Sequence, residues 1–142
     1  MPELYIIGGA NGSGKTTVAI SLLPNFLEVF EYVNADAIAA GLSPLNPESV
    51  AIQAGRLMLE RLRTLSDSGV DFAFETTLAS RTYASFLRNC KSKGYTINLI
   101  YFWLQSPELA ISFAGAKGNR TGATAGRKWR AFCSGGCDSS AL

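Results

Sequence analysis

The stretch that decides the fold of this chain is the nonapeptide Gly9-Ala10-Asn11-Gly12-Ser13-Gly14-Lys15-Thr16-Thr17. Its spacing, G-x-x-x-x-G-K-T, is typical of a loop that binds phosphate groups between a strand and a helix. Glycines let successive backbone N–H groups turn toward an anion, and the start of the next helix adds a positive dipole end. We therefore predict a nucleotide-binding loop over residues 9–17. The alternative is a glycine-rich turn that binds nothing.

The residues on both sides supply the context that such a loop requires. The apolar run Leu4-Tyr5-Ile6-Ile7 predicts a buried strand before it, and residues 18–23 predict the start of a helix that Pro24 ends. In this context Lys15 reaches the β- and γ-phosphates and the Thr16 hydroxyl can bind Mg²⁺. We therefore expect ATP and Mg²⁺ as cofactors and include Lys15 among the catalytic residues.

Beyond this loop, strands alternate with helices. The patterns predict strands over residues 30–34, 70–74 and 96–104, and helices over residues 47–69 and 81–93 and from residue 107. Asn46 is the expected cap of the longest helix and Gly69 its stop. This alternation predicts an α/β fold, with a parallel sheet flanked by helices.

Polar residues follow the predicted strands, at the edge where parallel sheets bind ligands. Asp36 is placed to act as the base that takes a proton from a substrate hydroxyl, or else to cap a short helix at residues 37–40. Glu75 could hold Mg²⁺ through water, bind a substrate hydroxyl, or simply end a solvated strand. Thr76 and Thr77 could donate to substrate oxygens, or reflect β propensity alone.

Arg81 begins the helix that follows these residues. A cation at that end of a helix dipole is unfavourable, which indicates an anionic ligand nearby; the alternative is a surface arginine. We therefore predict a substrate-binding group made of Glu75, Thr76, Thr77 and Arg81.

The length and composition of the chain limit the classes of protein to which it can belong. With 142 residues, 47% apolar and 17% charged, the chain is long enough for a single domain with a proper core. It shows no apolar span of membrane length and no basic leader before the first strand, so we expect a cytoplasmic protein that contacts no membrane. Three cysteines without a CxxC pair and no histidine favour a reduced chain without zinc.

The charge is unevenly distributed along the chain. Residues 1–113 hold 8 Lys/Arg and 10 Asp/Glu, whereas residues 114–142 hold 5 Lys/Arg and 1 Asp. The net charge of +2 therefore comes from the last segment, and we expect no nucleic-acid partner. That segment has six glycines and, among Ile, Leu and Val, only Leu142, so we predict a domain at residues 1–113 and a disordered tail at 114–142.

With these residues in view, the chain resembles the zeta toxin family of P-loop small-molecule kinases over about residues 2–113. Besides the phosphate loop, the resemblance rests on Asn34-Ala35-Asp36, Gly41-Leu42-Ser43-Pro44, Asn46-Pro47-Glu48, Ala54-Gly55-Arg56-Leu57-Met58-Leu59, Phe74-Glu75-Thr76-Thr77-Leu78 and Arg81-Thr82. The resemblance implies transfer of the ATP γ-phosphate to a hydroxyl of UDP-N-acetylglucosamine. It also implies that Lys15 and Thr16 hold phosphate and Mg²⁺, that Asp36 is the base, and that Glu75, Thr77 and Arg81 lie in the substrate pocket.

Family members are often paired with a small antitoxin protein, and their arginine-bearing lid follows the region matched here. Residues 114–142 depart from that lid pattern, and Asn119-Arg120-Thr121-Gly122-Ala123-Thr124 echoes it only faintly. We therefore expect a C-terminally incomplete fold with an open sheet edge and impaired transfer. The change of composition at Ala114 leads to the hypothesis of a shifted reading frame, which the coding DNA would test.

Three functions stay open at this point. The first is a kinase of the zeta toxin type, and the second is a P-loop kinase for another small hydroxylated metabolite. The third is a nucleotide-binding chain without turnover, serving only as an interaction module. The same residues of the phosphate loop serve all three functions. An assay of phosphate transfer to different acceptors is therefore needed to separate these functions.

Overall fold

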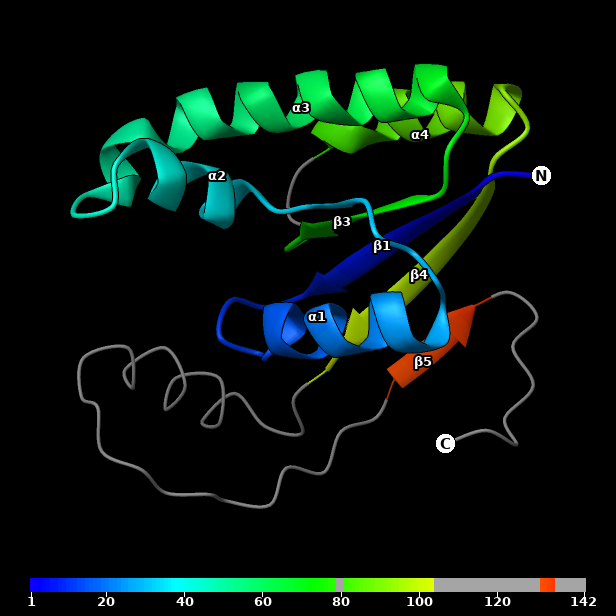
Figure 1. Cartoon of the computed structure of the whole chain (residues 1–142), viewed down its shortest axis with the longest axis horizontal. Helices are drawn as coiled ribbons and strands as arrows, with labels where there is room; N and C mark the ends of the chain where they lie inside the picture. The colour runs from blue at the N-terminus through cyan, green and yellow to red at the C-terminus, as the bar shows by residue number, and fades with distance from the viewer. Residues whose placement is uncertain (79–80, 104–130, 135–142) are drawn as a thin grey trace.

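The computed structural model describes residues 1–78, 81–103 and 131–134, the last of these as a backbone strand (Figure 1). Within them the elements follow one another as β1 (Glu3–Gly9), α1 (Lys15–Phe26), β2 (Tyr32–Val33), α2 (Ala35–Leu42), the 3₁₀ helix η1 (Pro47–Val50), α3 (Ala51–Ser68), β3 (Phe72–Thr76), α4 (Thr82–Ser92), β4 (Thr96–Phe102) and β5 (Ala131–Ser134). The expected alternation of strands and helices is confirmed.

The strands form one sheet in the order β2-β3-β1-β4-β5. The pairs β2–β3, β3–β1 and β1–β4 are parallel, whereas β5 runs antiparallel to β4. Figure 1 shows α3 and α4 on one face of the sheet and α1 on the other. The predicted fold class, a parallel sheet flanked by helices, is therefore confirmed. The central position of β1 places the loop that follows it at the middle of the sheet edge.

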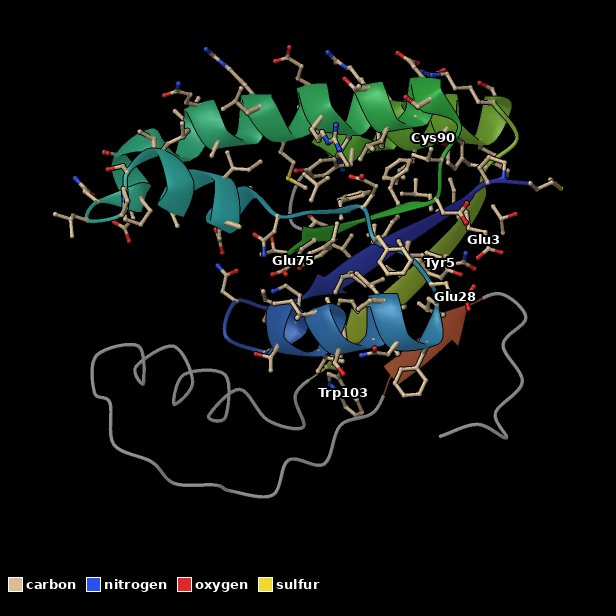
Figure 2. The ribbon with its side chains drawn as sticks, in the orientation of Figure 1. Glu3, Tyr5, Glu28, Glu75, Cys90 and Trp103 are labelled. Carbon is tan, nitrogen blue, oxygen red and sulfur yellow. The ribbon has the colours of Figure 1, made fainter. Side chains whose placement is uncertain are left out.

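Two apolar cores hold the layers together, one on each face of the sheet. Alternate residues of a strand point to opposite faces, so Phe72 and Phe74 pack under α3 and α4 while Ala73 faces α1. The core under α3 and α4 consists of Leu4, Ile6, Val33, Met58, Leu62, Leu65, Phe72, Phe74, Phe86, Cys90 and Tyr95. The core under α1 consists of Ile7, Ala19, Leu23, Val29, Ala73, Ile100 and Phe102. The side chains between the layers are drawn in Figure 2.

Two elements next to the loop differ from the sequence prediction. Helix α1 does not end at Pro24 but continues to Phe26, because a proline in the last turn keeps a helical φ and removes a single hydrogen bond. The strand expected over residues 30–34 is reduced to Tyr32–Val33, the two residues that pair with β3.

The long helix begins with a 3₁₀ turn at Pro47, close to the predicted start. Asn46 precedes it, but its side chain makes no capping hydrogen bond; its backbone carbonyl accepts from the Ser49 hydroxyl at 2.8 Å instead. Gly69 ends the helix with φ 68°, the left-handed conformation that a glycine stop requires, as predicted.

The segment after β4 is described only at Ala131–Ser134. The sequence predicted a disordered tail there, yet β5 pairs with β4 and places Cys133 opposite Ile100. Backbone hydrogen bonding along the β4 edge, rather than an apolar pattern, defines this strand. The helix expected from residue 107 and the disorder expected over the rest of 114–142 lie outside the described residues. Within the described part of the chain, no helix is long and apolar enough to cross a membrane.

Candidate functional site

The loop between β1 and α1 has the backbone that its glycines predicted. Gly9, Gly12 and Gly14 have φ values of 144°, 77° and 85°, which L side chains rarely adopt. A Cβ on Gly9 would lie 2.5 Å from the Phe102 carbonyl oxygen of the neighbouring strand β4. Gly14 precedes α1 and provides no side-chain cap, so the first turn of α1 is left without a capping side chain. Such a helix start can bind an anion.

Lys15 is the first residue of α1, and its side chain is almost fully buried. Its Nζ donates to the Ala10 carbonyl oxygen at 2.8 Å and lies 3.8 Å from Glu75 Oε1. Ser13, another residue of the loop, is also buried, and its Oγ has no protein hydrogen-bond partner. Lys15 is therefore folded back onto the loop, beside a carboxylate.

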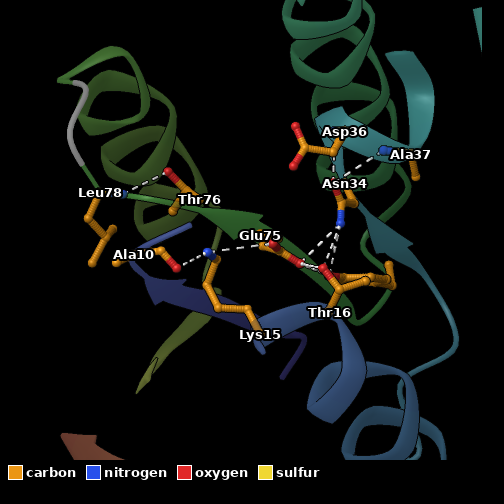
Figure 3. A network of polar contacts seen from close by, with 10 residues as sticks. Ala10, Lys15, Thr16, Asn34, Asp36, Ala37, Glu75, Thr76 and Leu78 are labelled. Carbon is orange, nitrogen blue, oxygen red and sulfur yellow. Dashed lines mark hydrogen bonds and ion pairs between the residues drawn. The ribbon is translucent and has the colours of Figure 1, made fainter. Parts of the chain in front are cut away.

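Glu75 lies near the end of β3, where the sheet meets α1 and α2 (Figure 2). The β1–β3 register sets Glu75 opposite Ile7, two residues before the loop begins at Gly9. Its Oε2 accepts hydrogen bonds from the Thr16 hydroxyl at 2.7 Å, from Asn34 Nδ2 at 3.0 Å and from the Tyr32 hydroxyl (Figure 3). The start of α1, the end of β2 and the end of β3 thus meet at this carboxylate.

Asp36 lies in the first turn of α2, but it is not the cap of that helix. The cap is Asn34, whose Oδ1 accepts from the backbone N–H of Asp36 at 2.8 Å and of Ala37 at 3.4 Å. The alternative that Asp36 caps this helix is therefore wrong. Because the helix begins at Ala35, two residues earlier than that alternative required, the exposed Asp36 carboxylate is not used for capping.

Lys15 and Asp36 line one cavity of about 220 Å³ at the carboxyl ends of the strands. The walls are completed by residues of the loop, the cap and start of α2, the end of β3 and α4, namely Asn11, Asn34, Ala35, Glu75, Thr76, Thr77 and Tyr83. The expected convergence of polar strand-end residues is thus observed. Asn11, Ala35 and Asp36 also border a second hollow of about 460 Å³, which continues over Ala39, Ala40, Pro47, Glu48 and Ala51.

The other residues singled out from the sequence lie as follows. Ala10, Asn11, Gly12, Thr16 and Thr17 are exposed in the loop and first turn of α1. Thr76 Oγ1 accepts from the Leu78 backbone N–H at 3.1 Å, which shapes the turn after β3. Arg81 has an exposed side chain before α4 and is not among the described residues that line the cavity.

Tyr32 and Asn34 are the site residues that sequence reasoning missed. Burial, together with the hydrogen bond to Glu75 and its charge, raises the pKa of the Tyr32 hydroxyl, so the neutral donor form is favoured. Alternate residues of a strand share a face, and the β2–β3 register, which only the structure shows, pairs Tyr32 with Ala73, two residues before Glu75. The two side chains therefore had to lie on the same face of the sheet.

The donor set next to the loop fits Mg²⁺. Thr16 offers a hydroxyl oxygen at an exposed position, and the Glu75 carboxylate lies within hydrogen-bond distance of it. Magnesium prefers such oxygen ligands and usually takes one or two from the protein, together with waters and phosphate oxygens. Thr16 would hold the ion directly, and Glu75 would stand behind it.

Solved structures share this fold. The chain superposes on a chain of the PezAT chromosomal toxin-antitoxin system of Streptococcus pneumoniae with a TM-score of 0.69 at 21% identity, over 82% of this chain and 52% of that one. A candidate kinase from Chloroflexus aurantiacus gives a TM-score of 0.67 at 18% identity, over 82% of this chain and 66% of that one. A sugar kinase from Janibacter sp. HTCC2649 gives 0.52 at 23% identity, over 87% of this chain and 70% of that one. The chain thus spans about half the length of the first of these.

Sequence comparison identifies the family. An uncharacterized protein of Haemophilus influenzae is 26% identical over 104 residues, which are 73% of this chain and 72% of that protein. The model of the zeta toxin family matches residues 1–130, past the domain boundary predicted at residue 113, which itself stays a prediction. Because that match covers most of the sequence and includes the phosphate loop and every predicted site residue, the chain belongs to the zeta toxin family.

Proposed function

We propose that this protein is an ATP-dependent kinase that transfers the γ-phosphate to a hydroxyl group of UDP-N-acetylglucosamine. The observation that carries the proposal is the shared cavity of Lys15 and Asp36. A phosphate-loop lysine and an exposed carboxylate at one cavity are the two groups that phosphoryl transfer to an alcohol requires. The P-loop kinase-like fold and the family membership agree with this reaction class.

The phosphates of ATP would occupy the loop over residues 9–17. Backbone N–H groups at the start of α1 would donate to them, and the Lys15 ammonium would exchange its contact with the Ala10 carbonyl for a phosphate oxygen. Lys15 is buried, so its charge acts in a low-dielectric surrounding where electrostatic stabilisation of the transferred group is strong. Bound Mg²⁺ neutralises charge on the phosphate oxygens.

Asp36 would act on the acceptor. Its carboxylate accepts the proton of the attacking hydroxyl as the bond from that oxygen to the γ-phosphorus forms and the bond to ADP breaks. The side chain is available for this because Asn34 has taken over the capping of α2.

Room for the acceptor extends to both sides of Asp36. The cavity with Thr76 and Thr77 offers hydroxyl groups, and the second hollow offers alanine and proline surface together with the Glu48 carboxylate. A nucleotide sugar is larger than the 220 Å³ cavity alone, so the acceptor would occupy both hollows. The choice of UDP-N-acetylglucosamine as the acceptor rests on the family. The role of Arg81 in binding the substrate remains a prediction.

The decisive experiment is a phosphotransfer assay on the purified chain with ATP and Mg²⁺. UDP-N-acetylglucosamine is compared with a panel of sugars, nucleosides and other nucleotide sugars, and the phosphorylated product is identified by mass spectrometry. Transfer to UDP-N-acetylglucosamine alone supports the proposal. Transfer to a different acceptor favours a kinase of another small metabolite. Nucleotide binding without transfer to any acceptor favours an interaction module without turnover, and a rate far below that of family members supports the impairment expected from the sequence.

An antitoxin protein is the partner that we propose. The structural similarity to a chain of a toxin-antitoxin system motivates it. The test is co-expression with the product of the neighbouring reading frame, followed by purification through a tag on one partner only. Separate elution of the two products at micromolar concentration would contradict this partnership.

A further inference from the structure

The two oxygens of the Glu75 carboxylate have different neighbours. Oε2 accepts from Tyr32, Thr16 and Asn34, and Oε1 faces the Lys15 ammonium at 3.8 Å. The side chains of Glu75 and Lys15 are 10% and 4% exposed. A carboxylate so deeply placed needs several donors, and with three of them on Oε2 that oxygen has little capacity left for the hydroxyl of an acceptor.

The Asn34 amide is oriented by the helix that it caps. Its Oδ1 is held by the backbone N–H groups of Asp36 and Ala37, so its Nδ2 points toward Glu75 and Thr16. One side chain therefore connects the start of α2, which carries the proposed base, to the carboxylate beside the phosphate loop. Figure 3 shows the Asn34 amide between the first turn of α2 and the Glu75 carboxylate.

The Thr16 hydroxyl is left with one lone pair for a cation. It donates its proton to Glu75 Oε2 at 2.7 Å and accepts from Asn34 Nδ2 at 3.3 Å. A hydroxyl oxygen has two lone pairs and one proton, so the remaining lone pair is directed away from both partners. Thr16 is exposed, which lets this lone pair reach a ligand.

We infer that Tyr32 and Asn34 are positioning residues that hold Glu75 on the Thr16 hydroxyl and thereby prepare Thr16 for the metal of a metal–nucleotide complex. Of the roles that the sequence left open for Glu75, this assigns it to the nucleotide side of the site and not to the acceptor. The inference rests on the proposed function, because it assumes that the loop binds a nucleotide together with Mg²⁺. Tyr32 and Asn34 touch neither phosphate nor acceptor in this scheme: Tyr32 acts through Glu75, and Asn34 acts through Glu75 and through its own contact with Thr16.

The test measures how strongly Mg²⁺ increases the affinity for the β,γ-imido analogue of ATP, by calorimetry with Mg²⁺ and with EDTA. Tyr32→Phe removes a single hydroxyl, and Asn34→Ser keeps a good helix cap while removing the amide donor. Each variant loses a hydrogen bond to the charged Glu75 carboxylate. Because such bonds are stronger than those between neutral groups, each variant should lower the affinity for the analogue in the presence of Mg²⁺ about ten-fold. The affinity in EDTA should change less than about two-fold, which shows that the variants are folded.

Tyr95→Phe is the matched control. It also removes a buried tyrosine hydroxyl, one that donates to the Val70 carbonyl at 2.9 Å, but it lies in the core under α3 and α4. This variant should lose stability and keep the full effect of Mg²⁺ on nucleotide affinity.

Three results would overturn the inference. If Tyr32→Phe and Asn34→Ser keep the wild-type effect of Mg²⁺ and raise only the KM for the acceptor, Glu75 serves the acceptor. If both variants weaken binding equally with Mg²⁺ and with EDTA, the network is structural only. If the wild-type chain binds no analogue under either condition, the proposed function fails as well, so the two failures are distinguishable.

Discussion

The Thr16 hydroxyl and the Glu75 carboxylate, 59 residues apart in the sequence, are joined by a hydrogen bond of 2.7 Å. This contact connects the first turn of α1 to the end of β3, because β1 and β3 are neighbours in the sheet. The phosphate loop therefore does not stand alone: the strand beside it supplies the acidic group that contacts both Lys15 and Thr16. The following predictions test the parts of this arrangement.

Lys15→Ala should weaken ATP binding and reduce transfer by at least about 10²-fold, since a group that stabilises charge in the transition state is lost. The variant also leaves Glu75 without its cation. Isothermal titration with ATP and a single-turnover assay measure the two effects. Lys93→Ala is the control, because that ammonium pairs with Asp67 at the far ends of α3 and α4. Wild-type ATP affinity in Lys15→Ala would contradict the assignment of the loop.

Asp36→Asn should bind ATP with nearly wild-type affinity and lose about 10²–10⁴-fold in turnover, the usual contribution of a general base. The helix should be unaffected because Asn34 caps it. Steady-state kinetics with a nucleotide-binding measurement separates these effects. Glu60→Gln, on exposed α3 surface, is the control. Unchanged turnover in Asp36→Asn would show that another group accepts the proton.

Gly9→Ala should destabilise the fold by about 2 kcal/mol or more, because the new Cβ would meet the Phe102 carbonyl at 2.5 Å and φ is 144°. Gly55→Ala, in the middle of α3 with no atom within 4 Å of its Cβ, should instead stabilise by about 0.5–1 kcal/mol. Urea unfolding followed by circular dichroism measures both changes. Equal effects of the two substitutions would be inconsistent with the close approach of the loop to β4.

The free energy of unfolding should fall as the pH rises above about 10, and Tyr32 should contribute to that fall. The folded state raises the pKa of Tyr32 above its ordinary 10.0, so in this range the unfolded chain loses a proton that the folded chain keeps. Fewer protons in the unfolded state mean that stability decreases with pH. Urea titrations between pH 8 and 11 should give a shallower decrease for Tyr32→Phe than for wild type. Parallel curves for the two proteins would argue against the buried contact with Glu75.

Much of the fold could be predicted from local patterns. The glycine-rich loop between a strand and a helix, the stop at Gly69 and the alternation of strands and helices each depend on residues close in sequence, and all were confirmed. The predicted end of α1 was wrong because a proline in the last turn of a helix keeps a helical φ and removes a single hydrogen bond. The strand Ala131–Ser134 was missed because it depends on the free edge of β4 and not on its own residues.

By itself, the sequence determined that a phosphate loop stands between a strand and a helix, and that carboxylates and hydroxyls follow the neighbouring strands. It could do so because backbone conformation and strand ends depend on local residue types. Only the tertiary structure decided which of these polar groups touch one another: that Asn34 and not Asp36 caps α2, and that Tyr32 and Asn34 bind Glu75. Strand order and register decide the contacts with Glu75, because they bring residues distant in sequence to the same edge of the sheet.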